Sequence, residues 1–166
     1  MSTVAEQDGQ DAAAVPDELV YEFGVLLGAA SALERIAGRE LERRCGIRHA
    51  VFEVLLRLSG EAADRPRSMG GLAGELILTS GGMTRIVDRM EEAGLVRREP
   101  SPGDRRRQLV ALTPAGRAKL DEALRVHAET LRAHFAGPLT EDGRRALVDA
   151  LRTLRASARE ELGDLR

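Results

Sequence analysis

Two segments decide the fold of this chain: residues 79–98, TSGGMTRIVDRMEEAGLVRR, and residues 104–116, DRRRQLVALTPAG. From Met83 on, the first segment carries apolar residues at helical spacing, and Gly94 is typical of a residue that ends a helix. After Gly94 the apolar period shortens to two, which is typical of strands. The pattern predicts two strands, over 95–99 and 107–112, joined by a loop over 100–104.

A short helix is expected just before the first segment. Ser68 is a good N-cap for a helix that ends near Leu76, and Thr79 or Ser80 can cap the helix that follows. The second helix should bury Met83, Ile86, Val87 and Met90. Its opposite face should expose Ser80, Gly81, Thr84, Arg85, Asp88 and Arg89. Two short helices on a tight connection form a helix-turn-helix, and the hairpin after it makes a winged helix.

Amphipathic helices flank this region. One runs from Asp17 to about Arg44 and is closed by Gly46, and a second lies between Ile47 and Leu58. Thr113-Pro114 predicts another helix start, Gly137-Pro138 its end, and Thr140 the cap of a last helix. The helix from Pro114 should bury one stripe: Leu120, Leu124, His127, Leu131 and Phe135.

The predicted fold is mainly α with a small β-hairpin: a winged helix-turn-helix flanked by dimerisation helices. Residues 1–16 are expected to be a disordered acidic tail, 47–113 the winged helix-turn-helix, and 17–46 with 114–162 the helical dimerisation region of one compact fold. The outer helices have more apolar surface than so small a domain needs, which favours pairing with a second copy. The residues expected at this interface are Leu19, Phe23, Leu26, Leu147, Leu151, Leu154 and Ala158.

Composition narrows the class of protein. The net charge is −2, but the first 22 residues hold six acids and no base, so the remainder carries an excess of four positive charges. All but one of the 25 basic residues are arginine, the better residue for contacts to phosphates and bases. A single cysteine, Cys45, excludes an internal disulfide, and no apolar stretch is long enough to span a bilayer. A cytoplasmic protein without a membrane contact, metal or cofactor is expected.

Leu72, Ala73 and Leu76, followed by residues 79–98, resemble the helix-turn-helix of the multiple-antibiotic-resistance regulator (MarR) family. Residues 104–116 match that family's wing pattern, Asp-x-Arg and then Val-x-Leu-Thr-x-x-Gly, and the resemblance covers about 18–160. It implies a homodimeric transcriptional regulator that binds palindromic double-stranded DNA, with the helix of 79–98 in the major groove and the wing in a minor groove. Many members are repressors released by small, often phenolic ligands or by oxidation.

Predicted DNA contacts follow from these patterns: Ser68, Thr79, Ser80, Gly81, Gly82, Thr84, Arg85, Arg89, Asp104, Arg105, Arg106 and Arg107. Arg85 is the best candidate for reading a base, because a guanidinium can pair with guanine through two hydrogen bonds. The resemblance places Arg106 in the minor groove, with Asp104 bracing the tip. Two alternatives stay open: Gly81 and Gly82 either allow close approach to DNA or are simply tolerated, and Arg89 either contacts DNA or pairs with Glu91 or Glu92.

A small-molecule effector, if one exists, would bind between the outer helices and the winged helix, where the candidate lining residues are Tyr21, Phe23, Arg48, His49 and Phe52. Cys45 is interpreted as a buried structural thiol, and His127 and His134 as packing or surface residues. The chain shows no nucleophile–base pair, metal-ligand cluster or phosphate loop, which argues against an enzyme. The alternative function is a helical protein-interaction adaptor that does not bind DNA.

Overall fold

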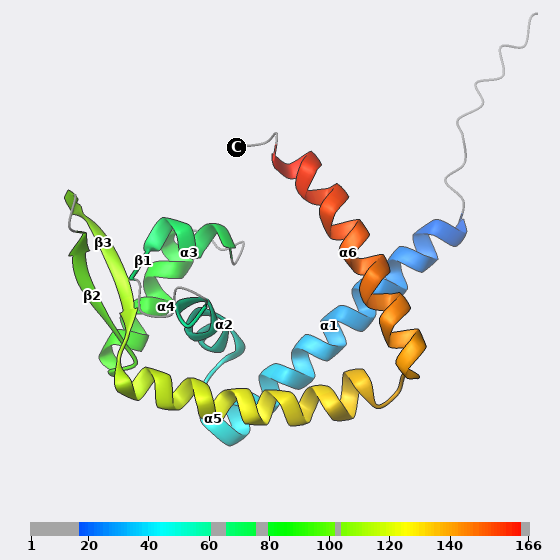
Figure 1. Ribbon diagram of the computed structural model, residues 1–166, viewed down its shortest axis with the longest axis horizontal. Helices are drawn as coiled ribbons and strands as arrows, with labels where there is room; N and C mark the ends of the chain where they lie inside the picture. Colours follow the sequence, from blue (N-terminus) through cyan, green and yellow to red (C-terminus); the bar gives the residue numbers. More distant parts are fainter. Residues whose placement is uncertain (1–16, 61–65, 76–79, 102–103, 164–166) are drawn as a thin grey trace, which may run out of the picture. The chain divides into compact units, whose positions relative to one another are not determined.

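The computed structural model describes residues 17–60, 66–75, 80–101 and 104–163. Its helices are α1 (Asp17–Cys45), α2 (His49–Leu58), α3 (Met69–Glu75), α4 (Ser80–Glu92), α5 (Pro114–Leu131), the π-helical turn η1 (Arg132–Ala136) and α6 (Glu141–Gly163) (Figure 1). Its strands are β1 (Arg67–Ser68), β2 (Val96–Ser101) and β3 (Asp104–Leu112). The predicted fold class, mainly helical with a small antiparallel sheet, is confirmed.

The chain divides into two compact units, Met1–Ala32 and Leu33–Arg166. The first unit contributes the N-terminal half of α1, and every other element belongs to the second. The helix ends follow the sequence pattern: Gly46 and Gly94 adopt positive φ angles of 68° and 70°, which glycine accepts without strain. The predicted caps are also confirmed, since the hydroxyls of Ser68 and Thr140 accept hydrogen bonds from backbone N–H groups in the first turns of α3 and α6.

The sheet has three strands in the order β1-β3-β2, all antiparallel. β1 was not expected, because two residues are too few to show an alternating pattern. The predicted loop over 100–104 was too long: Pro100 pairs with Gln108, and Ser101 with Asp104, so both strands extend further. Proline is tolerated there because β2 is an edge strand.

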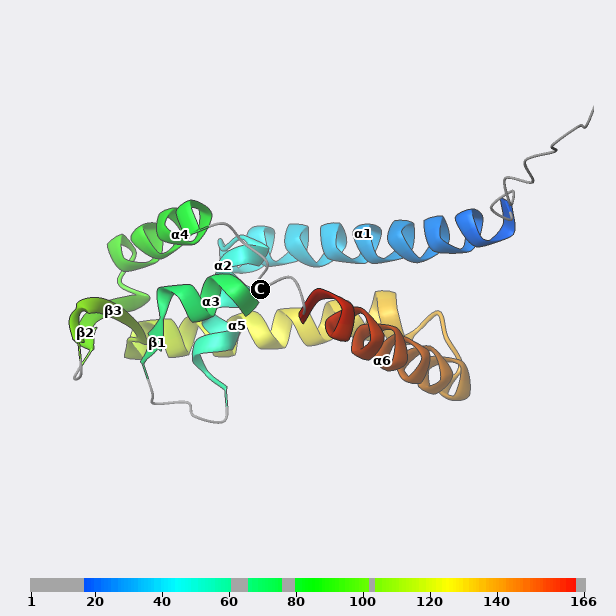
Figure 2. The ribbon, with the colours of Figure 1, turned by 90° about the horizontal axis from the view of Figure 1, so that it is seen from above.

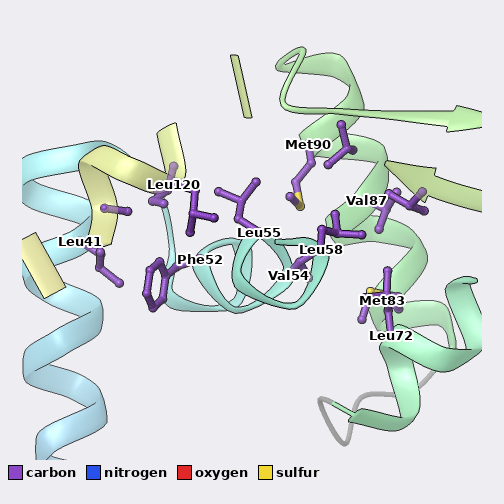
Figure 3. Packing of buried hydrophobic residues seen from close by; sticks show 14 of the residues in the cluster. Leu41, Phe52, Val54, Leu55, Leu58, Leu72, Met83, Val87, Met90 and Leu120 are labelled. Carbon is purple, nitrogen blue, oxygen red and sulfur yellow. The ribbon is translucent and has the colours of Figure 1, made fainter. Parts of the chain in front are cut away.

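The core of the second unit is centred on α2, where Phe52, Val54 and Leu55 are completely buried. Figure 3 shows Leu72 of α3 and three side chains of α4 on one side of α2, and Leu41 of α1 and Leu120 of α5 on the other. Figure 2 shows α2, α3, α4 and the strands from a second direction. This packing fixes α4 and the hairpin against one small apolar centre.

The predicted stripe of α5 was partly wrong. Its buried residues are Gly116, Leu120, Ala123, Val126 and Thr130, whereas Leu124 and Leu131 are exposed and His127 is only half-buried. The spacing of the leucines suggested a face that includes Leu124. The helix instead turns its small residues inward, because glycine and alanine allow neighbouring elements to approach closely.

The outer helices bury little. In the first unit Leu19, Phe23 and most of their apolar neighbours are exposed, and Leu26 is half-buried. α1 buries only Ala37, Leu41 and Cys45, all in the second unit. Along Glu141–Gly163, which the structure describes in full, no residue of α6 is buried. The N-terminal half of α1 and the whole of α6 therefore have amphipathic sequences whose apolar residues are not buried.

Candidate nucleic-acid interface

α4 presents one face to the core and the other to solvent. Met83, Val87 and Met90 are buried and Ile86 is half-buried, as predicted. The opposite face is exposed: Gly81, Thr84, Arg85 and Arg89. The buried face packs α4 against the core, and the outer face with Thr84 and Arg85 is exposed to solvent. Their contact with DNA stays a prediction.

The fold itself does not require glycine at residue 81. Apart from its chain neighbours and the backbone of its own helix, no heavy atom of the described residues would come within 4 Å of a Cβ added to Gly81. A positive φ is found only at Gly46 and Gly94 among the described glycines. Glycine in a helix costs up to about 1 kcal/mol relative to alanine, less in a first turn. The alternatives of close approach to a ligand and simple tolerance therefore both remain.

The wing is the β2–β3 hairpin, with residues 102 and 103 at its tip outside the described residues. Asp104 begins β3 with an exposed side chain that has an interaction within the chain. The backbone of 105–107 continues β3, but the side chains of Arg105, Arg106 and Arg107 lie outside the described part, as do the side chain of Ser80 and all of Thr79. The predicted contacts of these residues thus stay predictions.

A cluster of charges joins β2 to α4. The Nη1 of Arg98 donates to Glu91 Oε2 at 2.5 Å, and its Nη2 donates to Asp88 Oδ1 at 2.5 Å. The backbone N–H of Arg98 also donates to Glu91 Oε1 at 3.0 Å. Burial on its own would lower the pKa of the guanidinium, but the hydrogen bonds to the two carboxylates outweigh it and raise this pKa. Arg98 therefore stays charged between the two acids.

This cluster corrects two predictions. Asp88 was expected to be exposed on the outer face of α4, but it is half-buried and bonded to Arg98. Glu91, a suggested partner of Arg89, is also bonded to Arg98, and no ion pair of Arg89 is found among the described residues. A signal for Arg98 existed in the sequence: it lies two residues after the buried Val96, and residues at this spacing share one face of a strand.

A second connection joins the α4–β2 turn to the start of α5. The Thr113 hydroxyl donates to the Gly94 carbonyl at 2.6 Å and accepts the Gly116 N–H at 3.0 Å. The backbone N–H of Thr113 donates to the Leu95 carbonyl at 3.1 Å. We call these four residues, Gly94, Leu95, Thr113 and Gly116, the Thr113 clasp. It explains physically why a Thr-x-x-Gly pattern ends the wing.

Gly116 is required by this close approach. A Cβ added there would lie 1.9 Å from the Leu95 carbonyl oxygen, far inside the contact distance. The backbone of α5 thus packs directly on the turn that follows α4. The sequence showed Gly116 as part of the family pattern but gave no reason for it.

Ser68 has a structural role in the chain. Its Oγ accepts the Gly71 N–H at 3.1 Å and so caps α3, while its backbone pairs with Leu109 in the sheet. The hydroxyl keeps capacity for a further hydrogen bond, since Ser carries a donor and two acceptor lone pairs. The cap positions the connection from the sheet into α3.

Three rings meet where α2 contacts α5. The Phe52 and His127 ring centroids are 4.8 Å apart, and His49 lies 6.2 Å from Phe52 and 6.3 Å from His127. His49 is half-buried between the carboxylates of Glu34, at 3.8 Å, and Glu53, at 4.0 Å. Phe52 is completely buried, so it supports this ring cluster from inside and is not the accessible lining residue expected from the sequence.

His127 carries an unsatisfied buried atom. Its Nδ1 has no hydrogen-bond partner among the described residues. Burial first, and then the neighbouring His49, lower the pKa of the imidazole, partly opposed by Glu53. His127 is therefore neutral at pH 7, and it is a packing residue as predicted. His134 is exposed, which also agrees with its prediction.

The other residues predicted to line an effector site are exposed. Tyr21 and Phe23 are exposed residues of the first unit, and Arg48 is exposed just before α2. Cys45 is buried, as predicted, and burial raises the pKa of its thiol, which makes the thiolate less accessible. The described residues contain no group of three His, Cys, Asp or Glu arranged to hold a metal ion.

Within the described parts of the chain, no helix combines the length and the apolar character that crossing a membrane requires. A sequence model of the MarR family matches residues 46–107, which include α2, the helix-turn-helix and most of the hairpin. The transcriptional regulator YsmB of Bacillus subtilis is 31% identical over 120 residues, covering 72% of this chain and 80% of YsmB. The chain belongs to the MarR family.

Further relatives agree with MarR-family membership. The regulator YkoM of Bacillus subtilis is 31% identical over 87 residues, and this match spans 52% of the chain and only 56% of YkoM. Sco3205 of Streptomyces coelicolor, a MarR-family regulator solved in complex with DNA, has a TM-score of 0.77 at 26% identity and covers 90% of the chain and 92% of its own. CouR of Rhodococcus jostii, solved with p-coumaroyl-CoA, has a TM-score of 0.69 at 26% identity, with coverage of 82% and 93%. The chain is thus a transcriptional regulator and not an enzyme.

Proposed function

We propose that this MarR-family chain binds a palindromic operator in double-stranded DNA as a homodimer and represses transcription by covering it. The observation that carries this proposal is the outer face of α4, where Thr84 and Arg85 are exposed on a helix held from behind by Met83, Val87 and Met90. A helix held in this way can enter a major groove with its polar side chains directed to base edges. The arginine-rich hairpin that follows α4 suits the neighbouring minor groove.

The residue roles follow from this placement. Arg85 reads a base, Thr84 and Arg89 support it, and Gly81 and Gly82 bring the first turn of α4 close to a phosphate. Arg105, Arg106 and Arg107 contribute the wing contacts, with Asp104 bracing the tip. Sco3205, a relative of similar fold, was solved in complex with DNA, which supports DNA binding by this chain.

The homodimer rests on the uncovered apolar faces of the outer helices. Phe23 in the first unit is 61% exposed and Leu154 in α6 is 55% exposed. A second copy is the natural cover, because a twofold dimer would place two reading helices about 34 Å apart, one DNA turn. Sedimentation equilibrium should give twice the chain mass of 18.0 kDa. A strictly monomeric protein would contradict the homodimer.

The test of DNA binding begins with selection of bound fragments from random duplexes. A twofold-symmetric consensus is expected. Fluorescence anisotropy with this consensus should then show an affinity that falls steeply with salt, and Arg106→Ala should weaken it and reduce the log–log slope by about 0.9. No salt-dependent binding at micromolar protein would refute DNA binding and favour the protein-interaction adaptor.

An effector that releases the DNA is a second part of the proposal. Its support is the half-buried His49 beside the unsatisfied Nδ1 of His127, a polar pair at the edge of an apolar cluster. CouR, a relative with the same fold, binds p-coumaroyl-CoA. Aromatic carboxylates and their CoA esters should weaken binding to the consensus, and His49→Ala should remove that response and leave affinity without ligand unchanged. If none of these compounds changes the affinity, this part fails.

A further inference from the structure

Arg98 holds the wing to α4 at a point beyond the turn that connects them. The turn itself is short, with the Leu95 N–H donating to the Met90 carbonyl at 2.8 Å, and it includes Gly94 with its positive φ. The base of the hairpin is also held by the pairing of β3 with β1 and by the Thr113 clasp, but neither contact joins β2 to the outer part of α4. The tilt of β2 against α4 therefore needs a restraint of its own. The bonds of Arg98 to Asp88 and Glu91 fall three residues further along β2 and restrain that tilt.

The geometry of the contact is stiff. Asp88 and Glu91 lie three residues apart, on neighbouring turns of one face of α4, and each receives one arm of the planar guanidinium. Glu91 also accepts the backbone N–H of Arg98, so that one carboxylate holds both the side chain and the main chain of β2. This N–H belongs to the edge strand of the sheet, where it would otherwise point to water.

The environment makes the contact more than a surface ion pair. The Arg98 side chain is only 22% exposed, whereas that of its neighbour Arg97 is 58% exposed and bonds Glu99 within the same strand. Partly buried, charge-assisted hydrogen bonds are stronger and more directional than exposed pairs. Both Nη atoms of Arg98 are used on α4, so Arg98 is directed to the protein and away from a phosphate.

We propose that Arg98, Asp88 and Glu91 form a brace that sets the angle between α4 and the β2–β3 hairpin, and that Arg98 is thereby a positioning residue for sequence recognition. This inference rests on the proposed DNA binding. The base-reading residues of α4 and the wing arginines must fit two neighbouring grooves together, so a hairpin free to pivot loses the register between them. Contacts to phosphates tolerate such freedom, whereas contacts to bases do not.

The first experiment compares two neighbouring arginines in the full chain. Arg98→Gln and the matched control Arg97→Gln remove the same charge from adjacent positions of one strand. Anisotropy titrations use the selected consensus duplex and a scrambled duplex of equal length. Arg98→Gln should weaken consensus binding about tenfold or more and change scrambled binding by no more than about threefold, while Arg97→Gln should change both about equally. Equal effects of the two variants would overturn the brace.

The second experiment uses the sign of the charge. Asp88→Asn and Glu91→Gln each remove a negative charge, which by general electrostatics should tighten binding to the DNA polyanion. The brace predicts the opposite for the consensus: weaker binding, with scrambled binding unchanged or tighter. In the double variant Arg98→Gln/Glu91→Gln the losses should not add, since both break one contact. Tighter consensus binding by both acid variants would refute the brace.

Folding is checked on the same samples. Arg98→Lys keeps the charge but not the two-armed geometry, so it should retain the fold and recover only part of the consensus affinity. Thermal melting identifies any variant that has lost its structure. If Arg98→Gln is such a variant, the test of the brace rests on Asp88→Asn and Glu91→Gln. If the wild-type chain binds neither duplex, the proposed function fails. If the wild-type chain and Arg98→Gln bind the consensus with equal affinity, only the brace fails.

Discussion

α2 of the winged helix region, residues 49–112, and α6 both carry apolar residues at helical spacing, but they differ in burial. Leu55 of α2 is completely buried among neighbours from α3, α4 and the sheet, whereas Leu154 of α6 is 55% exposed. The apolar face of α2 is covered by α3, α4 and the sheet, with Leu41 of α1 and Leu120 of α5 completing the core, whereas no residue of α6 is buried. Amphipathic spacing thus predicts which face of a helix is apolar, but not which surface covers it.

The largest effect on stability should come from truncating a buried side chain of α2. Leu55→Ala should lower the free energy of unfolding by about 2–5 kcal/mol, because it removes packed atoms and leaves a cavity. Leu154→Ala should leave the unfolding of isolated chains almost unchanged and weaken self-association instead. Urea unfolding at several protein concentrations, with sedimentation, separates the two. Equal destabilisation at every concentration would show that α6 is covered within its own chain.

Gly116→Ala tests the contact between the start of α5 and the turn after α4. The added methyl group would meet the Leu95 carbonyl oxygen at 1.9 Å, so the backbone must shift and the Thr113 clasp must open. We expect a loss of about 3 kcal/mol in unfolding free energy. Gly74→Ala in α3 is the matched control, because no described atom lies within 4 Å of its added Cβ. If Gly116→Ala and Gly74→Ala have the same melting temperature, the close approach of α5 to Leu95 does not limit stability.

His127 should make the chain sensitive to mild acid. Burial lowers the pKa of its imidazole below the ordinary 6.5, so the unfolded chain binds the proton more readily than the folded chain. Stability should therefore be complete above pH 6.5 and fall as the pH drops below it, while most carboxylates remain ionised. His127→Phe should flatten melting temperatures between pH 7.5 and 5.5, and His134→Gln, at an exposed position, should not. If the melting temperature of His127→Phe falls with pH as steeply as that of the wild type, His127 is not the source of the acid sensitivity.

The smallest effect on stability has an opposite sign from the effect on function. Gly81→Ala should stabilise the fold by less than about 1 kcal/mol, because alanine favours helix and meets open space there. Binding to the consensus duplex should nevertheless weaken if α4 approaches DNA closely at this residue. The measurements are thermal melting and anisotropy on the same protein, with Gly74→Ala as the control. Unchanged affinity would favour the reading that Gly81 is simply tolerated.

Much of the fold follows from local signals. The period change after Gly94, the caps at Ser68, Thr113 and Thr140, and the buried positions of α4 were all predictable, because each depends on neighbours in the sequence. β1 could not be predicted from the sequence, since its two residues gain strand structure only by pairing with β3. The buried face of α5 was misjudged because the larger Leu124 and Leu131 gave a stronger apolar signal than the buried Gly116, Ala123 and Val126.

The candidate site, like the fold, could be predicted from the sequence only in part. The exposed face with Thr84 and Arg85 follows from helical geometry once the buried face is known. The partners of Arg98 were missed, because the contact joins two elements and the sequence shows only that a charged residue shares a strand face with Val96. Long-range pairs of this kind depend on how the hairpin folds over α4.

The Thr113 clasp has a mechanical consequence. α5 begins at this joint and continues for 18 residues, about 27 Å at 1.5 Å per residue. A long rod fixed to a turn acts as a lever, so a small tilt of its far end applies torque to the base of β2. A stimulus acting on distant α5 residues would thereby reach the wing without touching α4 or the nucleic acid.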